Sequence, residues 1–194
     1  MNGSRKRLLR LRGGPLGALL DDRGIAAVEF AILAPIFGLI FAGVADFGNV
    51  LFTQFRLSAA VSAGANYAMV NQANVSSTGG AALASNIAQV VESNAGSNWA
   101  DDGIVVNNGP SKTITGGTGS TGGTASNADS CYCPTLAPSF TWGSSATCAS
   151  PCSGGGIAGK FVTITASHSY TPLFSSYGIV SNGTITVTTA VQTS

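Results

Sequence analysis

The sequence is short of charge and of the residues that enzymes use. Only 9% of its 194 residues are charged and its mean hydropathy is +0.31, which is unusual for a freely soluble cytoplasmic protein. It contains one histidine, His168, in an alternating stretch typical of a β-strand. No nucleophile motif accompanies this histidine, and no phosphate-binding glycine loop leads from a strand into a helix. We therefore expect no enzyme and no catalytic residue.

Ligands for metals and cofactors are also scarce. Asp101 and Asp102 are adjacent carboxylates, which alone are weak evidence for calcium. The stretch "GGTGSTGGT" is rich in glycine but lies in low-complexity sequence, where it indicates flexibility. The cysteine pattern CxC…CxxxC fits zinc spacing poorly. We expect no metal and no cofactor.

The basic residues are concentrated at the N-terminus. Six of the nine precede the first long apolar run, namely Arg5, Lys6, Arg7, Arg10, Arg12 and Arg23. A basic tail can bind nucleic acid, but one that directly precedes an apolar run follows the positive-inside rule. We therefore expect no nucleic-acid partner, a cytoplasmic leader over residues 1–24, and the C-terminal part across a membrane.

The apolar run from Ile25 to Ala45 is long enough to span a bilayer. As a helix its 21 residues extend about 31 Å, which matches the hydrocarbon thickness of a membrane. A buried core helix is the alternative, but such helices seldom run this far without polar interruption. We expect a transmembrane helix over residues 25–45 and an extracytoplasmic domain over residues 46–194.

The helical pattern continues beyond the membrane segment. Apolar and small residues recur near one face at Val50, Leu57, Val61, Gly64 and Ala68. The simplest expectation is one helix from Ile25 to Val70. Two helices that meet near Asp46–Gly48 are the alternative.

The remainder predicts an α+β fold. A second helix is expected over Ala81–Asn94 and a short strand within 103–107, followed by an exposed Gly/Ser/Thr-rich loop over 107–130. Residues 160–170 alternate as in a strand, and Asn182-Gly183 is a preferred turn pair that would join two further alternating runs. The fold is thus a long N-terminal helix, a second helix and a small C-terminal antiparallel sheet.

Four cysteines cluster in a loop over residues 131–152. They are Cys131, Cys133, Cys148 and Cys152. Outside the cytoplasm they most simply form two disulfides, for which three connectivities exist. The close spacing of the first two makes a bond between them awkward, so links between the first pair and the second pair are favoured.

A carboxylate, Glu29, lies near the start of the apolar run. Gly24 is followed by Ile25 and three more small or apolar residues, and then by Glu29 and Phe30. This pattern has the form of a prepilin processing site, in which a peptidase cuts after the glycine. Glu29 could then neutralise the new amine of a neighbouring subunit. Alternatively, Glu29 snorkels to the membrane interface.

One face of the same helix carries small residues. Ala34, Gly38 and Ala42 recur every four residues, with Ala27, Ala31 and Ala45 nearby. Small residues so placed let another helix approach closely in lipid. Glu29 lies on the opposite face, so the sequence predicts two surfaces for subunit packing.

The stretch "RGIAAVEFAILAPIFGLIFAGVADFGNVLFTQFRLSAAVSAGANYA" resembles the N-terminal region of TadE-like pseudopilins of the tight-adherence (Flp, type IVb) pilus system. "YTPLF" (Tyr170 to Phe174) also looks like the family, whereas residues 72–159 do not. The resemblance implies a pilin-like fold and a minor pilin-like subunit in the bacterial inner membrane, which helps to assemble or initiate adhesive pili. It implies as partners an aspartyl prepilin peptidase, other pilins and the pilus assembly machinery.

Two other functions remain open at this stage. An uncleaved, membrane-anchored envelope or surface protein could bind a partner through its Gly/Ser-rich loops. A secreted binding protein could arise if signal peptidase cut between Ala45 and Asp46. The N-terminus of the mature chain distinguishes these three functions.

Overall fold

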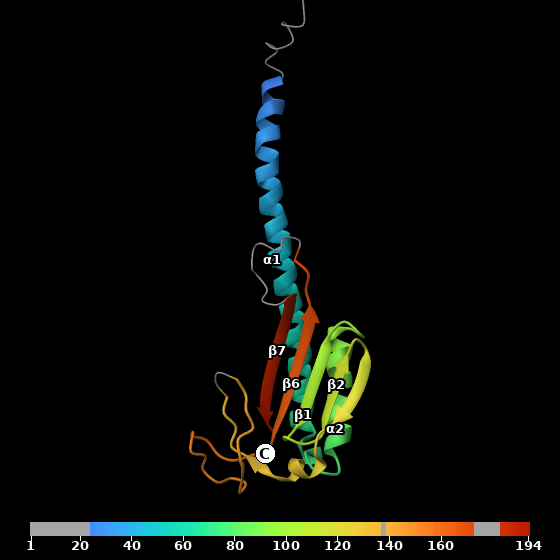
Figure 1. Ribbon diagram of the computed structural model, residues 1–194, viewed down its shortest axis with the longest axis vertical. Helices are drawn as coiled ribbons and strands as arrows, with labels where there is room; N and C mark the ends of the chain where they lie inside the picture. Colours follow the sequence, from blue (N-terminus) through green and yellow to red (C-terminus); the bar gives the residue numbers. More distant parts are fainter. Residues whose placement is uncertain (1–23, 137–138, 173–182) are drawn as a thin grey trace, which may run out of the picture. The chain divides into compact units, whose positions relative to one another are not determined.

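The computed structural model describes residues 24–136, 139–172 and 183–194 (Figure 1). In chain order its main elements are α1 (Ile25–Val70), η3 (Gln72–Asn74), α2 (Gly80–Ala95), β1 (Asp101–Val106), β2 (Ser111–Thr115), β3 (Thr118–Gly122), η4 (Ala125–Asp129), β4 (Cys131–Tyr132), β5 (Ser145–Ala146), β6 (Phe161–Ser169) and β7 (Thr184–Gln192). This order confirms the α+β class. The chain divides into two compact units, Met1–Val44 and Ala45–Ser194.

α1 is one helix of 46 residues, so the alternative of two helices that meet near Asp46–Gly48 is wrong. Pro35 lies inside it, where its ring removes one backbone hydrogen bond. The buried residues of α1 all belong to the second unit: Asp46, Val50, Thr53, Leu57, Ala60, Val61, Gly64, Ala65 and Ala68. The stripe predicted from the sequence is therefore the face that α1 contributes to the domain core.

α2 covers the same core and matches its predicted range to within one residue at each end. Gly64 of α1 explains how closely the elements approach one another. A Cβ at this position would lie 2.9 Å from Val91 Cγ2 of α2 and 3.3 Å from Ile164 Cδ1 of β6. Only the absence of a side chain at Gly64 lets the helix lie this close.

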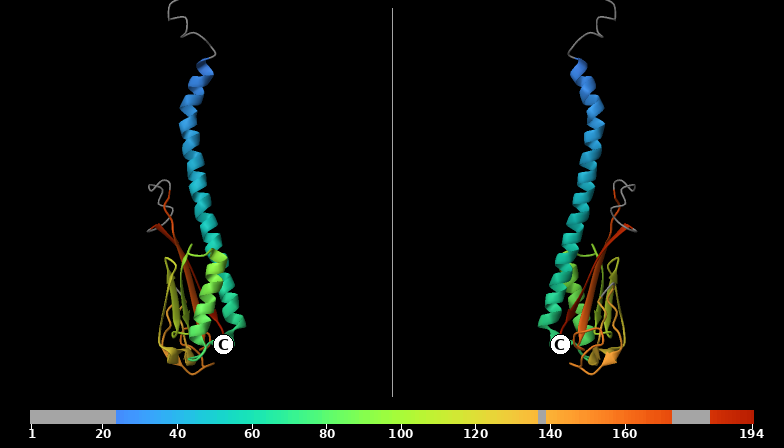
Figure 2. Two further views of the ribbon diagram at one scale, coloured as in Figure 1. Left: turned by 90° about the vertical axis from the view of Figure 1, so that its right-hand side faces the viewer. Right: turned by 90° about the vertical axis from the view of Figure 1, so that its left-hand side faces the viewer.

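Five strands form an antiparallel sheet in the order β3-β2-β1-β6-β7. β1 and β6 are central, and their fully buried Ile104, Val106, Val162 and Ile164 join the core cluster. Figure 2 shows the helices of the second unit gathered on one face of the sheet. The predicted strands at 103–107 and 160–170 correspond to β1 and β6.

The prediction of an exposed loop over residues 107–130 is wrong. This segment contains the β2–β3 hairpin and the short helix η4. β3 has the sequence TGSTG and is exposed throughout, so it carries no apolar alternation that could reveal it as a strand. The hairpin forms through backbone pairing between β2 and β3, which the amino-acid composition of the segment does not predict.

Asn107 holds the end of that segment against the sheet. It is fully buried, and its Nδ2 donates to the carbonyl oxygens of Ala128 (3.0 Å) and Ser130 (2.6 Å). Its Oδ1 accepts from the Phe161 backbone N–H at 3.1 Å. Gly123 has φ +82°, and a Cβ there would collide with the Gly109 carbonyl oxygen at 1.8 Å. The segment is thus folded by specific polar contacts.

β7 closes the sheet by pairing with β6 over nine consecutive residue pairs, from Phe161↔Gln192 to Ser169↔Thr184. The Tyr170 backbone N–H donates to the Gly183 carbonyl at 2.8 Å beyond the last pair. The expected turn at Asn182-Gly183, with the alternating run before it, falls largely outside the described residues.

Candidate processing and assembly site

The four residues of the predicted processing pattern lie in the first turns of α1. Gly24 directly precedes the helix, and a Cβ on it would meet nothing within 4 Å. Ile25 is 55% exposed, and Glu29 and Phe30 are also exposed. The Gly24–Ile25 peptide bond therefore lies at the start of α1, next to exposed side chains of its first turns.

Glu29 is the only charged residue between positions 25 and 44. It follows Ile25 by four residues, so the two lie on one face about 5–6 Å apart between their Cβ atoms. An amine created at Ile25 would consequently lie within one helical turn of this carboxylate.

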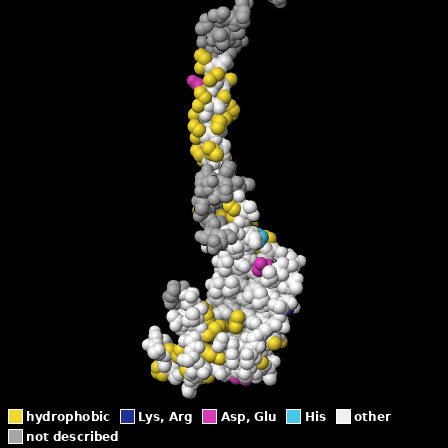
Figure 3. All heavy atoms as spheres, in the orientation of Figure 1, with side chains coloured by type: hydrophobic (Ala, Val, Ile, Leu, Met, Phe, Trp, Pro, Cys, Tyr) yellow, Lys and Arg dark blue, Asp and Glu magenta, His cyan; other side chains and the backbone are white. Residues whose placement is uncertain are grey.

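Large apolar side chains surround Glu29 along the first unit. Those with high exposure are Ile25, Val28, Phe30, Ile32, Leu33, Ile36, Phe37, Leu39, Ile40, Phe41 and Val44. Figure 3 shows this part of the helix covered with apolar side chains. Its most apolar 18-residue window has a mean hydropathy of 2.3 and none of it is buried within the chain. By length and composition, α1 can cross a membrane.

Within the described residues, no side chain covers the small-residue face at Gly38. Ala34 and Ala42 are half-exposed, Gly38 is exposed, and a Cβ on Gly38 would meet nothing within 4 Å. The face has the small side chains that close helix approach requires. Its role in subunit packing stays a prediction.

Asp46 and Tyr170 form a buried polar contact inside the second unit. Asp46 is 1% exposed, and the Tyr170 hydroxyl donates to its carboxylate and, at 3.1 Å, lies near its backbone carbonyl. This bond to the carboxylate raises the pKa of Tyr170, as do burial and the charge of Asp46, while Asn49 opposes them. The contact ties α1 to the end of β6.

Sequence reasoning did not find this contact, although one signal for it exists. Asp46 precedes Val50 by four residues and therefore continues the stripe of buried residues along α1. A carboxylate on such a stripe needs a polar partner in the core. The partner's identity, Tyr170, depends on the tertiary fold.

His168 takes part in a stack of three side chains. The Arg56 guanidinium lies 4.1 Å from the centre of the Trp99 ring, and His168 stacks on Trp99 with ring centroids 4.0 Å apart. The His168 Nδ1 also lies 2.5 Å from the Trp99 carbonyl oxygen. These contacts join α1, the segment before β1, and β6, and they give the histidine a packing role.

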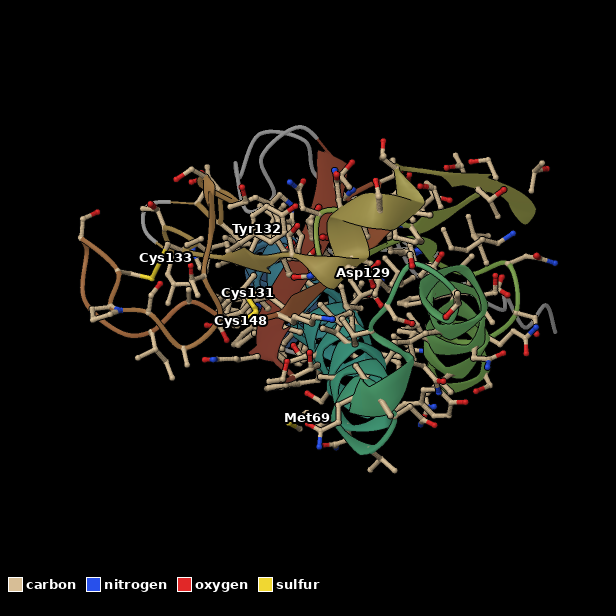
Figure 4. The ribbon with its side chains drawn as sticks, turned by 90° about the horizontal axis from the view of Figure 1, so that it is seen from below. Met69, Asp129, Cys131, Tyr132, Cys133 and Cys148 are labelled. Atoms are coloured by element: carbon tan, nitrogen blue, oxygen red, sulfur yellow. A yellow bond between two sulfur atoms is a disulfide. The ribbon has the colours of Figure 1, made fainter. Side chains whose placement is uncertain are left out.

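The cysteines form two disulfides, Cys131–Cys148 and Cys133–Cys152, with Cα–Cα distances of 5.1 and 5.6 Å. Both link the first pair to the second, as favoured from the sequence (Figure 4). The short strands β4 and β5 of the same loop pair with each other. Tyr132 of β4 is buried, and its ring centroid lies 5.9 Å from that of Trp142. In the described ranges, no group of three or more His, Cys, Asp or Glu side chains could hold a metal ion.

Two carboxyls of the domain have shifted acidity. Burial, followed by the charge of Glu92, raises the pKa of Asp102 from its ordinary value of 3.8 to about 7. Asp129 differs, because hydrogen bonds from the Ser77 side chain and backbone lower its pKa. The Ser77 backbone N–H lies 2.8 Å from Asp129 Oδ1. The carboxyl of Asp102 is thus expected to change its protonation near neutrality.

Comparison with known proteins identifies the N-terminal segment. Residues 24–66 match the family model described as TadE-like protein. No curated protein and no solved structure matches the chain. The match covers the apolar segment and most of the rest of α1, and confirms the resemblance over those residues.

Proposed function

Because residues 24–66 match the TadE-like family, which belongs to the Tad pilus system, we propose that this chain is a minor pilin-like subunit, a pseudopilin, of a Flp (type IVb) adhesive pilus. Residues 1–24 would form a cytoplasmic leader and residues 25–45 the anchor in the bacterial inner membrane. Residues 46–194 would lie outside and could enter the pilus with the helix. The role is structural: the subunit takes part in pilus assembly or initiation.

The observation that carries the proposal is a single carboxylate on an otherwise apolar, exposed helix. Within the first unit Glu29 lies five positions after Gly24, among large apolar side chains. A lone carboxylate costs roughly 2.5–3.5 kcal/mol at the centre of a membrane helix and less near the interface. A cationic partner at the same depth would recover part of this cost.

Cleavage after Gly24 would create such a partner. A prepilin peptidase that hydrolyses the Gly24–Ile25 bond leaves a cationic amine on Ile25, in the same face as Glu29. In a single subunit the amine and carboxylate lie one turn apart. During assembly the Glu29 of an incoming subunit would pair with the amine of a neighbour, which sets the axial register between the two helices.

The face with Ala34, Gly38 and Ala42 would supply the second contact. Nothing in the described chain lies against Gly38, so another helix can approach its backbone. Other pilins of the same system are the expected occupants. Glu29 would then determine the register, and the small residues would determine the distance between helices.

The position of Ala45 inside α1 and the burial of Asp46 support an anchored chain over the secreted alternative. The Ala45–Asp46 bond lies in the interior of α1, and Asp46 is buried against Tyr170. Signal peptidase would need this region extended, and the mature domain would then begin at a residue of its own core. This argument does not apply to the uncleaved anchor, which the N-terminal sequence of the mature protein distinguishes from the cleaved subunit.

The intact mass and N-terminal sequence of the protein from native membranes test the processing step. A chain that begins at Ile25 supports the prepilin route. A chain that retains residues 1–24 contradicts it and leaves Glu29 as a snorkelling residue in a static anchor. A chain that begins at Asp46 identifies a secreted protein.

Replacement of Glu29 tests the pairing step. Glu29→Ala should insert and lose its leader normally but enter pili at least tenfold less efficiently, as measured by immunoblotting of sheared pili. Glu29→Gln keeps the shape without the charge and should behave in the same way. Glu92→Ala, on α2 of the domain, is the matched control and should assemble normally. Normal incorporation of Glu29→Ala would show that the carboxylate has no pairing role.

A further inference from the structure

The outer edge of β7 lacks the features that usually protect an edge strand. β7 ends the sheet, and its nine residues, TITVTTAVQ, include no charge and no proline. Its register with β6 runs through nine successive pairs without interruption. Over the described ranges, no strand pairs with its other side. Natural edge strands are usually short, charged or bulged, because an open edge attracts other strands.

The other edge of the sheet is a poorer candidate. β3 has only five residues, and two of them are glycines that weaken a strand. It also presents no apolar side chain that could contact a partner. β7 therefore offers the longer row of backbone groups.

A cleft lies along the second half of β7. It has a volume of about 570 Å³, and Thr188, Thr189 and Ala190 line one side. Leu136, Ser139 and Phe140 line the other side. Leu136 is 70% exposed, so this wall presents an apolar side chain to the open space. No charged residue lines the cleft among the described residues.

We propose that this β7 groove, the outer edge of β7 with the facing Leu136 and Phe140, binds an extended, uncharged strand of a different protein by β-strand addition. The free N–H and C=O groups of an edge are complemented by another extended backbone, which determines the class of partner. The apolar wall favours an aliphatic side chain on that strand. The uncharged lining gives no anchor for an acidic or basic peptide.

The directions of β7 and the helix argue against the β7 of a second copy as the partner. In the second unit, residues 50–68 of α1 pack along the sheet on which β7 is the last strand (Figures 1 and 2). Antiparallel pairing of β7 with the β7 of a second copy would relate the copies by a twofold axis perpendicular to the sheet. That axis would reverse the helix of the second copy. Two copies anchored in one membrane, as the proposed function requires, cannot pair in this way.

A synthetic peptide tests the groove directly. The probe is the acetylated, amidated peptide TITVTTAVQ with a fluorescent label, an uncharged strand that is free of the membrane constraint. Its binding to the full-length protein in detergent is followed by fluorescence anisotropy. The control probe is the same peptide with alternate backbone amides N-methylated, which removes hydrogen-bond donors but keeps every side chain.

Two lysine variants distinguish the groove from the rest of the sheet. Thr188 lies in the groove and Thr113 lies on β2, and both are exposed. Thr188→Lys removes only an exposed hydrogen bond between the Thr188 and Thr165 hydroxyls, so both replacements should change the melting temperature little. Wild type and Thr113→Lys should bind the peptide with equal affinity, whereas Thr188→Lys should bind at least tenfold more weakly. Amide hydrogen exchange in β7 should slow when the peptide binds.

Three results would overturn the proposal: no saturable binding to the wild-type protein, equal binding to the two lysine variants, or undiminished binding of the N-methylated peptide. None of these would affect the proposed function, since cleavage at Gly24 and the role of Glu29 are measured separately. Conversely, an uncleaved anchor would leave the groove and its partner class unchanged.

Discussion

The two parts of α1 bury their apolar residues in different ways. Residues 25–44 expose eleven large apolar side chains. From Asp46 onward the same helix places a stripe that includes Leu57 and Val61 in the core of the domain. Composition also separates them, because Glu29 is the only charged residue of the first part, whereas the second carries Asp46, Arg56 and several uncharged polar residues.

One continuous helix can therefore have two parts in different environments, one exposed and one buried in a domain core. The second part is covered by α2 and the sheet, as Gly64 shows by its closeness to Val91 and Ile164. The first part needs lipid or other helices to cover it. Stability of the single chain should therefore depend on the second part, and assembly on the first.

The largest expected effect comes from a matched pair of leucines. Leu57 is fully buried, and Leu57→Ala should lower the free energy of unfolding by about 2–5 kcal/mol. Leu33 is 50% exposed, and Leu33→Ala should change it by less than about 0.5 kcal/mol. Chemical denaturation of the full chain in detergent measures both. Equal losses would mean that the two parts of α1 do not differ as described.

A pair of glycines sharpens the same comparison. Gly64→Leu would force atoms into Val91 and should destabilise the domain by about 1–3 kcal/mol. Gly38→Leu meets nothing within 4 Å and should leave unfolding unchanged, yet block close helix approach and reduce incorporation into pili. Melting temperature and pilus content are measured for each variant. A Gly38→Leu protein that melts early would contradict the openness of that face.

The smallest effect, when taken per unit of pH, concerns Asp102, a buried carboxylate of the second unit. The folded-state pKa of Asp102 is raised to about 7, so the folded protein binds more protons than the unfolded chain between about pH 4 and pH 7. Stability should therefore fall as pH rises through this window and level off above it, by at most about 1.4 kcal/mol per pH unit. Asp102→Asn should remove this slope in urea titrations at several pH values. If the free energy of unfolding of Asp102→Asn still falls as pH rises, another titratable group causes the pH dependence.

The sequence predicts the helices well because their signals are local. The apolar run and the 3.6-residue periodicity after it located α1, and the periodicity located α2 to within one residue at each end. The buried stripe of α1 follows from the same period. Periodicity did not predict β2 and β3, because their Thr, Ser and Gly residues give no apolar alternation. Asn107 instead holds this segment through hydrogen bonds with Ala128, Ser130 and Phe161. Such contacts join residues far apart in the chain and leave no local pattern.

The candidate site shows the same division. The apolar length, the position of Glu29 after Gly24 and the spacing of Ala34, Gly38 and Ala42 are all visible in the linear sequence, because a single helix displays them. The link between Asp46 and Tyr170 is not visible, since these residues are 124 positions apart. The β7 groove is equally hidden, because its walls come from separate segments.

By itself, the sequence determined where a helix would form, which of its residues are apolar, and that one carboxylate interrupts the apolar segment. These properties depend on neighbours within a few positions along the chain. Only the tertiary structure decided which elements cover the second part of that helix, which of the possible cysteine pairings forms, and which strand is left at the edge of the sheet. Those outcomes depend on contacts between distant segments, and such contacts form only when the whole domain folds.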